Sequence, residues 1–361
     1  MQHEGEALRL LDRLTEKRTL TLNEWRTLLE QRNGPVASEA QKRAQQLAQS
    51  SFGQGIYFRG IVEISNHCQC DCNYCGLRAS HAKLSRYRLC DEEILAACQE
   101  GYTHGIRTFV LQSGEDPALT DERLCTTLSL IKSRFPDCAL TLSLGERSSD
   151  SYHSLRQYGC DRYLLRHETA SPFLYERLHS ARQSFWHRIS CLFSLKAEGF
   201  QTGCGMMIGP PGQTLSDLAL DFVFLQDFAP EMVGIGPFLP HHATPYAKDP
   251  PGDISLTLYV VSLCRLLLPG VLMPATTALA AHSKNGFTQG ILHGANVVMP
   301  QLTPLVHKKD YLLYDKMPVT EPLTQTLEKI ENQLQAVGYH LQSGRGDYND
   351  ALRTGTKKEQ A

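Results

Sequence analysis

The stretch Thr108–Glu115, TFVLQSGE, decides the fold. Four residues suited to a buried strand lead directly into glutamine, serine, glycine and glutamate. The same change, from a short strand to small, polar or charged residues, recurs along the chain. The expected strands are residues 61–65, 108–113, 139–144, 161–167, 201–208, 232–236, 271–274 and 296–299.

Helix-like stretches separate most of these strands, at residues 91–102, 121–135, 149–158, 185–198, 215–228 and 256–268. Thr214 and Asp217 have the spacing of a capping box, which predicts a helix that begins at Leu215. Eight strands, most of them followed by a helix, predict a (β/α)8 TIM barrel of the α/β class. An open, doubly wound sheet is the alternative. It would scatter the polar strand ends, whereas a barrel gathers them on one face, so we favour the barrel.

The barrel is expected to span residues 56–319, with helical additions on both sides. Residues 1–55 have the pattern of helices outside the barrel, and residues 320–342 that of a closing helix. The tail, residues 343–361, has few apolar residues and is predicted to be flexible.

Composition excludes several functional classes. Lys plus Arg is 36 against 38 for Asp plus Glu, a net charge of −2, and no basic tract indicates a nucleic-acid groove. The most apolar region, residues 260–281, is broken by Arg265, Pro269 and Pro274, so no membrane span is expected. The charged N-terminus does not resemble a signal peptide, and a cytoplasmic location is expected. Its reducing conditions argue against disulfides for the twelve cysteines.

The strongest chemical signal follows the first expected strand: CQCDCNYCG, with Cys68, Cys70, Cys72 and Cys75. Four thiols in such a short loop can converge on one metal centre, since thiolates bind iron–sulfur clusters and zinc. A zinc knuckle is the alternative, although it usually needs a second, distant pair of ligands. The other cysteines are isolated and are interpreted as small buried hydrophobic residues: Cys90, Cys98, Cys125, Cys138, Cys160, Cys191, Cys204 and Cys264.

The spacing Cys68-x3-Cys72-x2-Cys75 resembles the signature of radical S-adenosylmethionine (SAM) enzymes. The resemblance implies that these three thiolates hold a [4Fe-4S] cluster and leave one iron open to SAM. An electron from the cluster would then cleave SAM to methionine and a 5′-deoxyadenosyl radical. Cys70 does not fit the spacing and is interpreted as a spectator, with a competing ligand role left open.

The resemblance also implies where SAM binds. Gln112, Ser113, Gly114 and Glu115 resemble the turn that receives the methionine ammonium group. Glycine there lets the backbone approach a ligand closely. Apolar neighbours for the adenine are expected among Tyr74, Met207, Ile235 and Phe238, although core packing or a role of Tyr74 as a loop anchor explains them equally well.

The fourth expected strand carries alternating charges. Arg162, Arg166 and Glu168 share one face, which we expect to point into the barrel because Tyr163 and Leu165 suit the helices. Buried charges must be paired or must bind a ligand, and a structural Arg–Glu pair is the alternative. The resemblance assigns Arg166 and Glu168 to SAM, with Glu168 on the ribose hydroxyls. It assigns Arg188 to the SAM carboxylate, which suits a guanidinium.

Between Tyr57 and Leu313 the chain is similar to the HydE family of FeFe-hydrogenase maturases, in blocks such as CNYCGLR, VLQSGEDP, DRYLLRHETA, MVGIGPF and GANVVMP. The likeness implies a cavity beneath SAM for a small anion, an organometallic iron–cysteine complex. It also implies other maturation proteins and an electron donor as partners. The implied lining residues are Thr141, Ser143, Arg162, Thr276, Thr277, Met299 and Tyr311.

Some HydE proteins hold a second cluster on cysteines after the eighth strand. From Met299 onward this sequence has no cysteine, so one cluster only is expected. Three alternatives stay open: an amino-acid mutase of the methylornithine synthase type, an enzyme like biotin synthase, and a non-catalytic iron–sulfur or zinc-binding protein.

Overall fold

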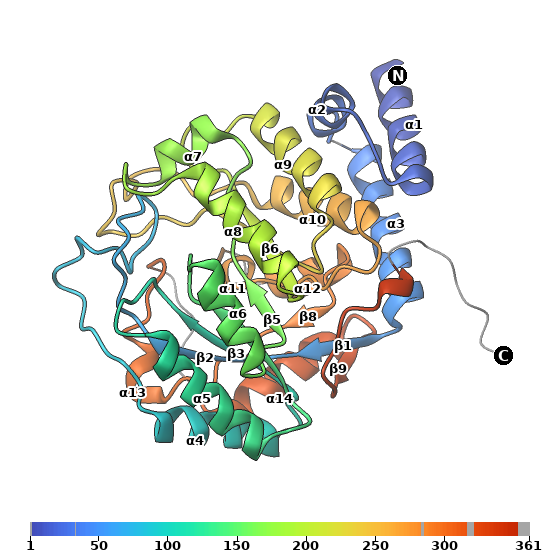
Figure 1. The fold of residues 1–361 in the computed structure, drawn as a ribbon. Helices are drawn as coiled ribbons and strands as arrows, with labels where there is room; N and C mark the ends of the chain where they lie inside the picture. The colour runs from blue at the N-terminus through green and yellow to red at the C-terminus, as the bar shows by residue number, and fades with distance from the viewer. Residues whose placement is uncertain (1, 33, 283–284, 316–320, 353–361) are drawn as a thin grey trace.

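The computed structural model describes residues 2–32, 34–282, 285–315 and 321–352. Its main sheet has six parallel strands in the order of the chain (Figure 1). They are β2 (Gly60–Ser65), β3 (Thr108–Ser113), β4 (Ala139–Ser143), β5 (Arg162–Leu164), β6 (Gln201–Ile208) and β7 (Met232–Pro237). A second sheet has the order β8–β1–β9, with β1 (Gly55–Phe58), β8 (Val297–Val298) and β9 (His340–Gln342).

Backbone hydrogen bonds join the two sheets into a ring. The expected seventh strand forms isolated parallel bridges to β7 on one side and to β8 on the other. The residues after β8 bond to β2, which continues from β1. The bonds that close the ring are Val233 N to Leu272 O (3.1 Å), Asn296 N to Met273 O (2.9 Å), Arg59 N to Val298 O (2.9 Å) and Ile61 N to Pro300 O (3.0 Å). The predicted barrel is confirmed.

Helices connect the strands and cover the sheet; Figure 1 shows α5, α6 and α8 in front of it. Thr214 caps α9 as predicted, because its side chain and that of Asp217 form the capping box. Tyr163 faces the helices, with its ring 5.2 Å from that of Tyr152 in α6. The connecting helices are α4 (Asp91–Thr103), α5 (Asp121–Arg134), α6 (Ser149–Gln157), α7 (Pro172–Leu178), α8 (Phe185–Ala197), α9 (Leu215–Phe228) and α10 (Ile254–Leu267).

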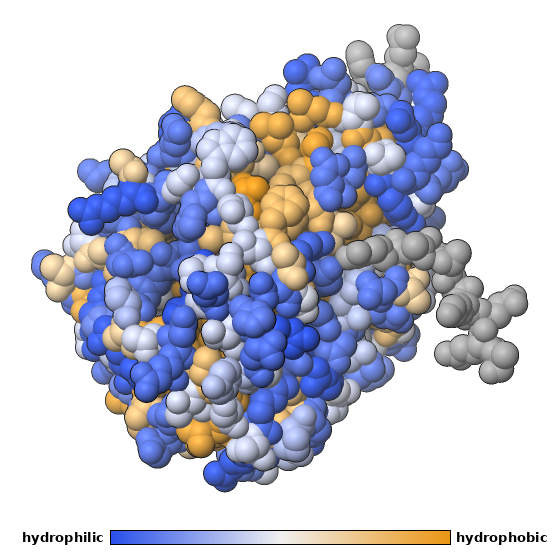
Figure 2. All heavy atoms as spheres, in the orientation of Figure 1, coloured by the Kyte–Doolittle hydropathy of each residue, from blue (hydrophilic) through white to orange (hydrophobic). Residues whose placement is uncertain are grey.

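Three helices precede the barrel: α1 (Gln2–Lys17), α2 (Leu22–Glu30) and α3 (Pro35–Phe52). They pack beside α9 and α10 (Figure 1). Trp25 stacks on Phe222 of α9 at 4.3 Å, and Tyr259 of α10 donates a hydrogen bond to Leu28 O at 3.0 Å. Figure 2 shows a mostly hydrophilic surface on this side, with an apolar area over α9.

Of the later helices only α14 (Leu323–Gln335) is long. The short ones are α11 (Thr277–His282), α12 (Gly286–Leu292), α13 (Leu305–Lys308) and the 3-10 turn η1 (Asp350–Leu352). Within the described residues, no helix has both the length and the hydropathy that crossing a membrane requires. The expected domain boundary at residue 319 and the end of the expected tail, residues 353–361, lie outside the described residues.

The expectation of a flexible tail is wrong for residues 343–352. This segment lies across the amino ends of the barrel strands. Ser343 donates to Gly105 O at 2.7 Å, the Tyr348 N–H donates to Gln201 Oε1 at 3.1 Å, and Arg59 donates to Gly346 O at 3.2 Å. The segment is ordered by polar contacts to the barrel, which a count of its apolar residues does not reveal.

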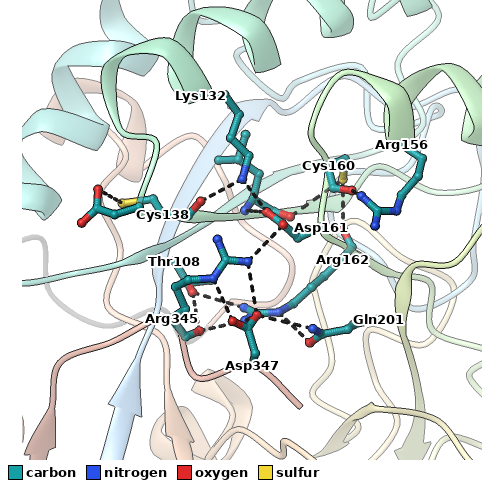
Figure 3. Close-up of polar contacts among 12 residues, drawn as sticks. Thr108, Lys132, Cys138, Arg156, Cys160, Asp161, Arg162, Gln201, Arg345 and Asp347 are labelled. Atoms are coloured by element: carbon teal, nitrogen blue, oxygen red, sulfur yellow. Dashed lines mark hydrogen bonds and ion pairs between the residues drawn. The ribbon is translucent and has the colours of Figure 1, made fainter. Parts of the chain in front are cut away.

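Arg162 explains why the segment is held there. Its side chain is fully buried, and the guanidinium donates to Asp347 Oδ1 at 2.7 Å and to Arg345 O at 2.8 Å. It also donates to Thr108 and Gln201, the first residues of β3 and β6 (Figure 3). A buried charge is costly unless it is paired and hydrogen-bonded, and the C-terminal segment supplies the pairing.

We predict that Asp347→Ala lowers the free energy of unfolding by about 1–3 kcal/mol, because it removes the carboxylate partner of a fully buried guanidinium. Urea denaturation followed by circular dichroism measures the change. Asp350→Ala alters an exposed acid three residues further on and is the control. Equal stability of both variants and the wild type would contradict a structural role for the Arg162–Asp347 pair.

Candidate functional site

The cysteine loop follows β2, at the carboxyl ends of the barrel strands, and three backbone hydrogen bonds fix it. Gln69 N donates to Glu115 O at the end of β3 (2.9 Å), and Asn73 N to Leu178 O at the end of α7 (2.8 Å). Gly76 N donates to Leu313 O, in the segment after α13 (3.0 Å). The loop is therefore tied to three separate parts of the chain at the barrel mouth.

The three cysteines of the x3–x2 motif are partly buried and interact electrostatically. A hydrogen bond from Cys70 lowers the pKa of Cys68 to about 7, whereas burial raises the pKa of Cys72 to about 12. The charge of Cys68 also raises the pKa of Cys72, and burial and the charges of both raise the pKa of Cys75, so the three thiols lie close together. A group of this kind can hold an iron–sulfur cluster or a zinc ion.

Cys70 lies beside Cys68 and is also hydrogen-bonded to Glu115. Its thiol donates a hydrogen bond to Glu115 Oε2 at 3.0 Å, and its backbone N–H donates to Cys68 Sγ at 3.4 Å. The neighbouring Cys68 and burial raise the pKa of Cys70, so its thiol stays protonated. The contact anchors the loop to the end of β3, and the spectator role of Cys70 stays a prediction.

Gly114 leaves the space that the cysteine loop occupies. A Cβ at this position would lie 2.5 Å from Cys68 Cβ and 2.5 Å from His67 O. No side chain fits there, because the loop occupies the space. The turn after β3 and the cysteine loop are therefore in direct contact.

Arg188 of α8 already has carboxylate partners. It donates to Glu146 at 2.5 Å and to Arg166 O at 2.6 Å, and it lies 3.8 Å from Glu115. The expected pairing with the SAM carboxylate stays a prediction; in this structure two carboxylates surround the guanidinium. They leave one negative charge in excess, which suits an ammonium group. Arg188 positions Glu115 and Glu146.

Arg166 and Glu168 carry buried polar atoms without partners. Arg166 Nη2 lies 3.1 Å from Glu168 Oε2, yet Arg166 Nε and Glu168 Oε2 make no hydrogen bond. Glu168 also has a φ of 64°, a left-handed conformation that costs a non-glycine residue roughly 1–3 kcal/mol. Backbone bonds to Gly205 O (2.9 Å) and from Met207 N (3.1 Å) hold it there. Incomplete pairing and strain at one residue are typical of a ligand-binding position.

The expected adenine neighbours divide into two groups. Tyr74, Met207 and Phe238 belong to one small apolar cluster between the cysteine loop and the ends of β6 and β7. Tyr74 is also hydrogen-bonded to His179 at 3.3 Å, so it anchors the loop as well. Ile235 lies instead in the main core, fully buried. The first group can flank a ligand at the mouth, and Ile235 cannot join it.

The expected substrate residues also divide. Gln112 donates to the Tyr311 hydroxyl at 3.1 Å and is in register with Ser143 on β4. Thr141 Oγ1 is buried without a hydrogen-bond partner. These residues line the barrel interior below the cysteine loop.

The other expected substrate residues already have contacts within the protein. Thr276 donates to Ile235 O at 3.2 Å, and Thr277 accepts from Tyr314 at 2.9 Å. Met299 packs against a separate apolar cluster. Arg162 is next to Thr141 in register, but its guanidinium is committed to the C-terminal segment. Its expected role as a substrate contact is not supported, because four of its N–H groups are already used inside the protein.

Sequence reasoning missed Glu63, a buried carboxyl group on β2. It accepts hydrogen bonds from Gln301 and Thr303, in the segment after β8, and burial raises its pKa to about 7. Glu63 is in register with Gln112 and so lies near Tyr311. A single acid within the apolar strand GIVEIS was the available signal.

We predict that stability falls as pH rises from about 4.5 to 7, because the folded state holds the Glu63 proton more tightly than the unfolded state does. The loss amounts to about 3 kcal/mol, at about 1.4 kcal/mol for each pKa unit. Urea denaturation at several pH values measures it. Glu63→Gln keeps the shape and should remove this part of the pH dependence; an unchanged profile would contradict the raised pKa.

We predict that Gly114→Ala prevents binding of an iron–sulfur cluster, because the methyl group would displace Cys68. Iron content and visible absorbance after anaerobic reconstitution measure the loss, which should exceed about 90% if the site depends on this close approach. Gly5→Ala adds the same methyl group where no atom lies within 4 Å and is the control. Full iron content in Gly114→Ala would show that the loop tolerates displacement.

Comparisons with known proteins agree with this geometry. The family model described as the Radical SAM superfamily matches residues 62–224. The [FeFe] hydrogenase maturase subunit HydE of Thermotoga maritima is 41% identical over 298 residues, which cover 82% of this chain and 85% of that protein. A 3-methylornithine synthase of Methanosarcina barkeri is 25% identical over 329 residues, covering 91% and 92%.

Solved structures share the fold. The crystal structure of methylornithine synthase (PylB) has a TM-score of 0.78 at 24% identity and covers 92% of this chain and 97% of its own. That of HydG, a maturase of the [FeFe]-hydrogenase, has a TM-score of 0.78 at 17% identity, covering 98% and 78%. The matched superfamily implies a [4Fe-4S] cluster and SAM as cofactors. The chain therefore belongs to the radical SAM superfamily, as an enzyme of the family that includes HydE of Thermotoga maritima.

Proposed function

We propose that this enzyme cleaves SAM reductively and acts on a small anionic iron–cysteine complex during maturation of FeFe-hydrogenase. The observation that carries the proposal is a three-cysteine loop at the same strand ends as the half-buried Arg166 and the buried Glu168, which are incompletely paired. The 41% identity to the [FeFe] hydrogenase maturase subunit HydE over most of the chain supports the role in maturation. Other maturation proteins and an electron donor are the partners that this role requires.

Cys68, Cys72 and Cys75 would hold a single [4Fe-4S] cluster, and the electrostatic effect of their thiols on one another supports this ligand set. Bound together, the cluster and SAM supply a 5′-deoxyadenosyl radical. We assign the methionine ammonium group to the surplus negative charge of Glu115 and Glu146. A positive group is stabilised there because Arg188 balances only one of the two carboxylates.

The remaining SAM contacts follow from the unpaired atoms. Arg166 Nε is the free donor for the SAM carboxylate, and Glu168 Oε2 is the free acceptor for the ribose hydroxyls. Tyr74, Met207 and Phe238 would flank the adenine, which they can do by apolar contact alone. Buried donors and acceptors without partners gain most from such a ligand, since leaving them unpaired is costly.

The substrate would lie deeper in the barrel, between the hydroxyl groups of Thr141, Ser143 and Tyr311 and the amide of Gln112. Thr276, Thr277 and Met299 would complete the cavity. Below pH 7 Glu63 is mostly protonated, so it does not repel an anion in the cavity. Hydroxyl and amide donors suit a compact anion without fixing its identity.

The test is anaerobic reconstitution followed by product analysis with SAM and a strong reductant. Cys72→Ser should reduce 5′-deoxyadenosine to background, because the cluster loses a ligand. Cys70→Ser is the matched control and should keep wild-type product formation, since serine can also donate to Glu115. Loss in both variants would contradict the three-cysteine assignment.

The methylornithine synthase alternative rests on 25% identity over 91% of the chain. Incubation with lysine separates it from the maturase. The maturase proposal predicts activation of an apo-hydrogenase when the other maturation proteins are present, and no methylornithine. Methylornithine formation without hydrogenase activation would overturn the proposal and leave the radical SAM chemistry intact.

A further inference from the structure

A second group of metal-ligating side chains lies outside the cysteine site. His241 and His242 are in the loop after β7, and Asp315 is in the segment between α13 and α14. One ligand atom from each lies within 4.8 Å of the other two. Among the described residues, this is the only set of three His, Cys, Asp or Glu side chains spaced for one ion.

The contacts within the group leave one nitrogen unused. His242 Nδ1 lies 2.5 Å from Asp315 Oδ1, and the His242 backbone N–H donates to Asp315 Oδ2 at 2.8 Å. His241 Nε2 is 3.6 Å from Asp315 Oδ1 and makes no hydrogen bond, although the side chain is fully buried. A buried nitrogen aimed at a carboxylate without bonding to it indicates space for a ligand between them.

We propose that His241, His242 and Asp315 bind a divalent transition-metal ion of the zinc class. Two imidazoles and one carboxylate are ligands typical of zinc, with water in the fourth position. The exposed His242 and Asp315 bind the ion first. His241 Nδ1 accepts a hydrogen bond from the Ala243 N–H at 3.1 Å, so the ring proton of neutral His241 is on Nε2. To bind the ion through Nε2 as the third ligand, His241 moves this proton to Nδ1 and gives up the bond to Ala243.

The ion would connect two segments beside the cysteine loop. A Cβ on Gly76 would lie 2.5 Å from His241 Cδ2 and 2.2 Å from Leu312 O, so both segments pack on the residue after Cys75. The segment that carries Asp315 also carries Tyr311, which lines the barrel interior. Metal binding would thus fix this segment over the barrel mouth, independently of the reaction proposed above.

The test uses cluster-loaded protein, zinc chloride as the probe and anaerobic conditions. Calorimetric titration with metal analysis should find one zinc per chain in the wild type, with the iron content unchanged. His242→Ala and Asp315→Asn should each weaken zinc binding by more than about tenfold, because each removes a ligand. Both positions are exposed, so folding is not at risk.

His153→Ala is the matched control. His153 forms a surface pair with Glu198 at 2.9 Å and belongs to no set of three ligands among the described residues. It should bind zinc like the wild type, and zinc should raise the unfolding temperature of both. The proposal is overturned if the wild type binds no zinc, if His242→Ala and Asp315→Asn bind it unchanged, or if iron leaves as zinc enters.

Discussion

The burial of charged side chains in the barrel is the constraint on which the rest of this structure depends. A charged group that loses its contact with water must find a partner within the protein or in a ligand. At the amino end, the C-terminal segment pairs Asp347 with the fully buried Arg162. At the carboxyl end, Arg166 and Glu168 retain atoms without hydrogen bonds.

The same constraint gives Arg188 a structural role in addition to the one expected from the sequence. Its guanidinium joins Glu146, the backbone of Arg166 and, more distantly, Glu115, which follow three different strands. It therefore sets the relative positions of three strand ends. The site acts as a preorganised unit, since the carboxylates are held before any ligand arrives.

The sequence was sufficient to predict the barrel, because a change from apolar to polar residues marks the carboxyl end of each strand. It was also sufficient to group Tyr74 with Met207 and Phe238. It could not place the C-terminal segment, whose partner Arg162 lies 185 residues away in the chain. Contacts of that kind depend on register and depth within the barrel, and local composition carries no record of them. Glu63 was overlooked for the related reason that its hydrogen-bond partners come from the segment after β8.

Gly114 makes the turn after β3 and the cysteine loop depend on each other during evolution. Because the cysteine loop fills the volume that a side chain at this position would need, neither segment can change shape alone. A longer cysteine loop, or a larger residue in place of Gly114, would be tolerated only if a second substitution moved the other segment away. Substitutions at the two places should therefore occur as pairs, because each segment limits the space available to the other.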